Sequence, residues 1–163
     1  MSVILGIDPG SQLTGYGVIK ASNNQLSYIT SGCINSKKGS MPQRLAKISL
    51  ACQELVRTYR PDVMSIEKSF MAKNPNVAIV LGQARGVAIA AIATHNIPVF
   101  EYAPRLIKKA VVGTGNADKH QVQHMVSLLL GLQQAPQIDA ADALAIAICH
   151  THHLQTHTLS IKK

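Results

Sequence analysis

The sequence predicts an α/β protein with a mixed five-stranded sheet flanked by helices. The chain has 163 residues, of which 47% are apolar. A chain of this length buries roughly 70% of the surface that its unfolded form exposes, so we expect one compact domain. Segments rich in β-branched residues come first, and segments with apolar residues at three- and four-residue steps follow, separated by short apolar runs. This order favours a sheet with helices packed against it.

The first third of the chain predicts three strands. Residues 3–7 form a short apolar run that ends at the turn sequence DPGS. Residues 14–20 and 26–34 are rich in β-branched and aromatic residues, and Asn23-Asn24 between them suits a hairpin turn.

Helices and strands then alternate. Apolar residues from position 45 to position 56 recur with helical spacing, and the helix should end at Arg60-Pro61. Residues 63–67 return to a strand pattern. A long apolar helix should follow Asn74 and run to about residue 94, before another strand at 97–102.

Three helices are predicted in the last third. One begins near Pro104, a second is capped by Asp118, and a third runs from about Asp139 through the apolar segment that ends at residue 150. We expect a single domain over residues 1–155 and a flexible tail over 156–163.

Composition restricts the location and the partners. Sixteen Lys and Arg against eight Asp and Glu leave a formal charge of +8, which favours an anionic partner such as nucleic acid. The apolar stretch 77–94 is interrupted by Gln83 and Arg85, so we expect a soluble protein without a membrane span or targeting peptide. The three cysteines are scattered and lack the spacing of a disulfide framework or a zinc site, which indicates a reducing cytoplasm. The His-rich end of the chain does not have zinc-site spacing either.

Four of the eight acids lie in apolar surroundings. Asp8 ends the first strand and Glu67 ends the fourth, while Asp139 and Asp142 are three residues apart on one helix face of Ala, Leu and Ile. An unpaired carboxylate is costly there, and the last helix carries no Lys or Arg within its apolar part. Divalent cations would neutralise the charge.

Carboxylates that converge from separate elements suit Mg²⁺ or Mn²⁺, which prefer oxygen ligands and leave positions open for phosphate. One or two such ions can activate water and stabilise a leaving oxygen during phosphodiester hydrolysis. Taken singly, Asp8 also suits a turn, Glu67 an exposed strand end, and Asp139 and Asp142 a helix start. The combination favours metal-dependent chemistry, which should weaken in acid as the carboxylates bind protons.

Five sequence blocks, in order along the chain, resemble the RuvC family of Holliday junction resolvases. They are ILGIDPGSxxTGYGVI, IEKSFMAKN, LGQARGVA, VVGTGNADKHQVQHMV and DAADALAIAICH. The resemblance implies an RNase H-like fold, a homodimer and cytoplasmic action on four-way DNA junctions in recombination and repair. It also implies work with the branch-migration proteins RuvA and RuvB.

The resemblance also assigns roles to residues. It implies that Asp8, Glu67, Asp139 and Asp142 are the catalytic, metal-binding carboxylates. It places Lys119 and Lys108 at basic positions of the active-site region. Residues implied or expected to contact DNA are Phe70, Arg105, Lys108, Lys109 and Lys119.

Arg105, Lys108 and Lys109 share one helix face that would meet phosphates, although a solvated face gives the same pattern. Phe70 suits base stacking, and ordinary packing is its alternative. Gly82 and Gly86, four apart, would allow close approach of a second subunit or burial against the sheet. Lys68 stands where relatives commonly have Gln.

The sequence therefore predicts a Mg²⁺-dependent endonuclease, with Mn²⁺ as a substitute. It would nick two strands of like polarity in a four-way junction and leave 5′-phosphate and 3′-hydroxyl ends. Three rivals are considered: an actin-like ATPase, which needs a second phosphate loop and a longer chain; a junction-binding protein without catalysis; and an RNase H-like nuclease that acts on RNA.

Overall fold

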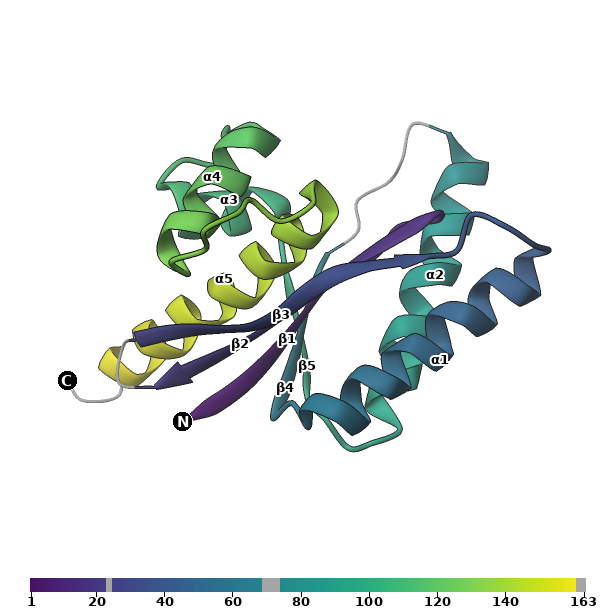
Figure 1. Ribbon diagram of the computed structural model, residues 1–163, viewed down its shortest axis with the longest axis horizontal. Helices are drawn as coiled ribbons and strands as arrows, with labels where there is room; N and C mark the ends of the chain where they lie inside the picture. Colours follow the sequence, from purple (N-terminus) through teal and green to yellow (C-terminus); the bar gives the residue numbers. More distant parts are fainter. Residues whose placement is uncertain (23–24, 69–73, 161–163) are drawn as a thin grey trace.

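The fold consists of one five-stranded sheet with helices on both faces, as seen in the computed structural model (Figure 1). The structure describes residues 1–22, 25–68 and 74–160, the side chains of 154–160 excepted. The strands are β1 (Ser2–Asp8), β2 (Leu13–Ser22), β3 (Gln25–Asn35), β4 (Val63–Glu67) and β5 (Val99–Tyr102). The helices are α1 (Met41–Tyr59), α2 (Pro75–Ala93), α3 (Pro104–Val112), α4 (Lys119–Leu129) and α5 (Ile138–Ser160).

The sheet has the order β3-β2-β1-β4-β5 and is mixed. Strand β2 is antiparallel to both β1 and β3, whereas β4 is parallel to β1 and to β5. Parallel neighbours need crossover connections, and α1 and α2 provide them. The predicted fold class and five-stranded mixed sheet are confirmed.

Two apolar cores lie on opposite faces of the sheet. Helices α3, α4 and α5 cover one face, and α1 and α2 cover the other (Figure 1). The alternation of side chains along β1 explains the division, because Ile4 faces α5 whereas Leu5 and Ile7 face α1 and α2. Helix α5 packs closely against β1, since a Cβ at Gly6 would overlap the carbonyl oxygen of Ala143.

The helix boundaries follow local signals. Asn74 caps α2 through a hydrogen bond from Asn76 N to its Oδ1, and Pro75 occupies the first turn. Asp118 and Gln121 form a capping box at the start of α4. Helix α5 extends to Ser160 and so enters the range 156–163 that the sequence predicts as a tail.

Helix α2 has an apolar face that the other described residues leave uncovered. Among the described helices it is the one that is long and apolar enough to cross a membrane by length and composition, with 22% of the span buried. Most of its exposed positions are apolar or small, including Ile79, Gly82, Gly86 and Ala90, while Asn76 and Gln83 are the exposed polar residues. A Cβ at either glycine would meet nothing within 4 Å.

Candidate active site

Two carboxylates emerge side by side at one edge of the sheet. Asp8 ends β1, Glu67 ends β4, and the parallel register pairs Ile7 with Ile66 just before them. Since Gly6 packs against α5 and side chains alternate along a strand, Asp8 faces the same side. The predicted convergence of the two strand-end acids therefore occurs in the fold.

The start of α5 brings the second pair of acids to this edge. Asp8 pairs with Gly15 of β2, and a Cβ at Gly15 would overlap the carbonyl oxygen of Asp139. The glycine therefore permits the backbone of α5 to approach the strand next to Asp8. Asp142, one helical turn further, then faces the strand ends.

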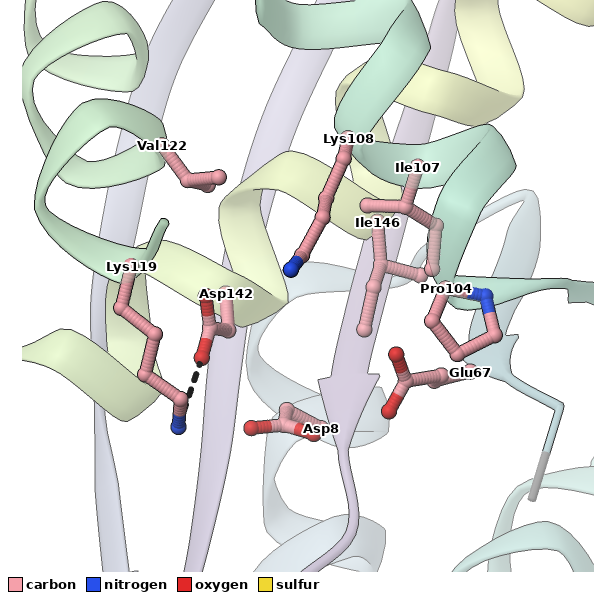
Figure 2. A pocket seen from close by; sticks show the side chains of 9 residues that line it. All are labelled: Asp8, Glu67, Pro104, Ile107, Lys108, Lys119, Val122, Asp142 and Ile146. Atoms are coloured by element: carbon pink, nitrogen blue, oxygen red, sulfur yellow. Dashed lines mark ion pairs between the residues drawn. The ribbon is translucent and has the colours of Figure 1, made fainter. Parts of the chain in front are cut away.

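A cavity of about 260 Å³ lies among these groups (Figure 2). The charged residues that line it are Asp8, Glu67, Asp142, Lys108 and Lys119, and the other lining residues are Pro104, Ile107, Val122 and Ile146. Figure 2 shows Lys119 and Asp142 on one side of Asp8, and Glu67 beneath Pro104 on the other. Three of the four predicted carboxylates thus line one cavity.

Asp139 stands apart from that arrangement. It is partly buried and is not among the residues that line the cavity. Its negative charge nevertheless raises the pKa values of Asp8 and Asp142, after larger effects from burial and other charges. The fourth predicted acid therefore belongs to the same electrostatic cluster.

Lys119 forms an ion pair with Asp142. It is the first residue of α4, directly after the Asp118 cap, and its Nζ lies 3.5 Å from Oδ2 of Asp142. Burial lowers the pKa of Lys119, but the charges of Asp142 and Asp8 outweigh burial and leave it raised. Lys119 therefore remains a cation beside the carboxylates.

The carboxylates hold protons more tightly than free carboxylic acids do. Burial, then the charges of Asp142, Glu67 and Asp139, raises the pKa of Asp8 from 3.8 to about 8, although Lys119 lowers it. Burial and Asp142 raise the pKa of Glu67 in the same way. Burial also raises the pKa of Asp142, despite its ion pair with Lys119.

These properties suit divalent cations. When all three carboxyl groups that line the cavity are ionised, their negative charge exceeds the positive charge of the two lysines, and a bound cation would balance it. Within the described ranges, no three His, Cys, Asp or Glu side chains come close enough to hold an ion by themselves. Mg²⁺ usually keeps several waters and takes only one or two protein carboxylates, so the donor set fits a partly hydrated ion.

The predicted DNA-contacting residues differ in position. Lys108 lines the cavity, whereas Arg105 and Lys109 lie exposed on α3, outside the group that lines it. The three residues therefore differ in exposure, and their contact with DNA stays a prediction. Phe70 lies outside the described residues.

Two arginines near the site were not predicted to belong to it. Arg85 of α2 pairs with Glu101 of β5, Nη2 to Oε2 at 2.8 Å, and its Nε donates to the carbonyl of Glu67 at 3.4 Å. The sequence held one signal that Arg85 has a special role: it is the single charged residue in an otherwise apolar helix. Arg44 of α1 donates to the carbonyl of Ser11 and so holds the loop that follows Asp8.

Comparisons with known proteins agree with the predicted resemblance. A profile of the family described as crossover junction endodeoxyribonuclease RuvC matches residues 4–150. The RuvC of Pectobacterium atrosepticum is 57% identical over 156 residues, covering 96% of this chain and 92% of that protein. The RuvC of Proteus mirabilis is 57% identical over 155 residues, covering 95% and 90%.

Solved structures give the same result. The structure of Thermus thermophilus RuvC in complex with a Holliday junction substrate has a TM-score of 0.90 and 30% identity, covering 97% of this chain and 98% of that one. The yeast mitochondrial Holliday junction resolvase Ydc2 shares the fold, with 16% identity and a TM-score of 0.66. The superposition covers 91% of this chain and 77% of the Ydc2 chain.

Proposed function

This chain belongs to the RuvC family of crossover junction endodeoxyribonucleases, and we propose that it resolves Holliday junctions by metal-dependent nicking of two strands of like polarity. The observation that carries the proposal is the cavity in which Asp8, Glu67 and Asp142 face Lys108 and Lys119. Carboxylates and cations in one cavity match the needs of phosphodiester hydrolysis: a site for divalent ions and positive charge for the phosphate.

Asp8, Glu67, Asp139 and Asp142 would hold the divalent cations. Three of them line the cavity, and Asp139 adds its charge beside them. We take Mg²⁺ as the resident ion, one or two per subunit, with Mn²⁺ as a substitute. When bound, such an ion supplies Lewis-acid activation of water and stabilisation of the leaving oxygen. Because burial and mutual repulsion raise their pKa values, the carboxylates must release protons before they bind it.

The lysines of the cavity act on the phosphate. Lys119 is held at the start of α4 and carries an exposed ammonium, so it can donate to a phosphate oxygen while it remains near Asp142. Lys108 approaches from α3 above the carboxylates (Figure 2). Water attacks phosphorus and the bond to the 3′-oxygen breaks, which leaves a 5′-phosphate and a 3′-hydroxyl.

Further residues would position the DNA. Arg105 and Lys109 lie exposed on α3 next to the cavity, where they can meet backbone phosphates without reading sequence. Phe70 follows Glu67 closely along the chain and is proposed to stack against bases at the crossover.

The active form would be a homodimer. A four-way junction has near two-fold symmetry, so two equivalent sites can each nick one of two like strands. The uncovered apolar face of α2, with Gly82 and Gly86 open to close approach, is suited to a second copy of this helix. A partner copy would remove this apolar surface from water.

The cellular setting follows from the substrate. DNA recombination and repair place the enzyme in the cytoplasm, together with the RuvA and RuvB branch-migration proteins. The free thiols of Cys33, Cys52 and Cys149 agree with a reducing compartment.

A cleavage assay with a labelled synthetic four-way junction tests the proposal. Paired nicks should appear with Mg²⁺ and vanish with EDTA or in the Asp8→Asn variant. Junction binding by wild-type protein without cleavage would favour a binding protein. Equal cleavage of linear duplex or RNA would favour a different nuclease of the same fold.

A further inference from the structure

A second cavity adjoins the carboxylate cavity on the side of α2. It has a volume of about 300 Å³ and lies between the loop after β1, the end of β4 and the first turns of α2. Glu67 and Pro104 line both cavities, so the two are neighbours that share a wall. A DNA strand that places one phosphate at the carboxylates must continue beyond them, and this second cavity offers it a path.

The wall of the second cavity contains a fixed guanidinium. The side chain of Arg85 is 19% exposed, and its ion pair with Glu101 and hydrogen bond to the Glu67 carbonyl hold it in place. A guanidinium has five N–H donors, so two contacts do not exhaust it. The ion pair with Glu101 offsets part of the positive charge of Arg85. A second cation at the cavity would therefore strengthen its attraction for an anion.

Lys68 is that second cation. Its backbone N–H donates to the carbonyl of Tyr102 at 2.8 Å, so the start of the side chain is fixed, while the side chain itself is exposed and lines the second cavity. The lysines that lower the pKa of Glu67 are Lys119 and Lys108, in the first cavity. Among the described residues, the lysine that forms a salt bridge is Lys119, so the ammonium of Lys68 is not taken up by a salt bridge.

We propose that Lys68, with Arg85 beside it, binds a backbone phosphate one or two nucleotides from the scissile phosphate on the cleaved strand. The proposal rests on the proposed function and adds a second phosphate subsite to the same active site. A lysine ammonium is a compact charge without a fixed hydrogen-bonding plane, so it suits phosphate more than a base edge. The nearby side chains of Ala78 and Leu81 are apolar, which is compatible with a deoxyribose.

Salt dependence of junction binding is the first test. In EDTA, Lys68→Gln should weaken binding roughly three- to tenfold, and the slope of log Kd against log salt should fall by about one, as expected for one lost phosphate contact. Lys68→Arg should restore both values. Lys20→Gln is the matched control, because Lys20 pairs with Val3 near the other end of β1.

A junction with single neutral linkages locates the contact. One methylphosphonate is placed in turn at each position within two nucleotides of the scissile phosphate. At one position it should weaken binding by wild-type protein and leave binding by Lys68→Gln unchanged. The subsite proposal would be overturned if each methylphosphonate affected binding by both proteins equally, or if Lys68→Gln left the salt slope unchanged. Either result leaves the proposed function intact, provided that the wild-type protein still cleaves the junction. Wild-type protein that neither binds nor cuts the junction would overturn the proposed function itself.

Discussion

The ammonium of Lys119 lies 3.5 Å from the carboxylate of Asp142, and this ion pair joins the first turn of α4 to the second acid of α5. The two side chains differ in exposure, at 64% and 23%. The lysine can therefore reach a ligand in the cavity, while the carboxylate stays among Asp8, Glu67 and the apolar wall. Because the Lys119 side chain is largely solvent-exposed, we expect the pair to add little to stability and to act mainly on the charge of the site.

Replacement of Lys119 by Gln should lower junction cleavage roughly a hundredfold, a magnitude typical of losing a group that stabilises developing charge. Because Lys119 lowers the pKa values of Asp8, Glu67 and Asp142, the acid limb of the rate profile should also move to higher pH. Lys119→Arg should keep the position of that limb. The measurement is the cleavage rate from pH 5 to pH 9, and an unchanged limb in Lys119→Gln would contradict the role.

Single amide substitutions of the four acids, Asp8→Asn, Glu67→Gln, Asp139→Asn and Asp142→Asn, should each abolish Mg²⁺-dependent cleavage. Amides remove the negative charge that attracts the cation but keep the size of the side chain. Circular dichroism should show intact folds, and junction binding in EDTA should persist. Normal turnover by any two of the variants would exclude the carboxylate cluster as the catalytic centre.

Metal-free protein should lose stability as pH rises. The folded protein raises the pKa of Asp8 from 3.8 to about 8, so between these values it holds a proton that the unfolded chain has released. The free energy of unfolding therefore falls from about pH 4 to about pH 8. In EDTA, Asp8→Asn should melt above wild type at pH 8.5 and equal to it below pH 4; a constant difference would contradict the shift.

Gly15→Ala should separate the two pairs of carboxylates. A Cβ at this position overlaps the carbonyl of Asp139, so the start of α5 must move away from Asp8. We expect the free energy of unfolding to fall by about 1–3 kcal/mol. The cleavage rate should fall by a much larger fraction of its wild-type value. Gly17→Ala, which meets Leu144 further along α5, is the control. It should lower stability and largely spare cleavage at low temperature.

A charge on the outer face of α2 should disrupt the proposed dimer. Ile79→Lys, combined with Gly86→Glu, places polar groups on the uncovered apolar face, so the variant should run as a monomer in analytical ultracentrifugation. Leu128→Lys on α4 is a matched control, because Leu128 is 61% exposed elsewhere on the surface. A monomeric wild type, or a dimeric double variant, would exclude this face as the interface.

The sequence by itself determined the elements and the chemistry of the site. Strand and helix boundaries follow local signals, such as the Asp118 cap and the Pro75 start, which act over a few residues and need no tertiary contacts. The four acids were visible because carboxylates in apolar segments are costly without a partner. The family resemblance added the junction substrate.

Only the tertiary structure decided how these parts meet. The packing of α5 on Gly15 sets the position of Asp139 beside the cavity while Asp142 lines it, and no spacing along the chain distinguishes the two. The ion pair of Arg85 with Glu101 joins α2 to β5, and the neighbouring cavity at Lys68 lies between segments far apart in sequence. Such contacts depend on how helices cross the sheet, which is fixed by packing over the whole core rather than by local sequence.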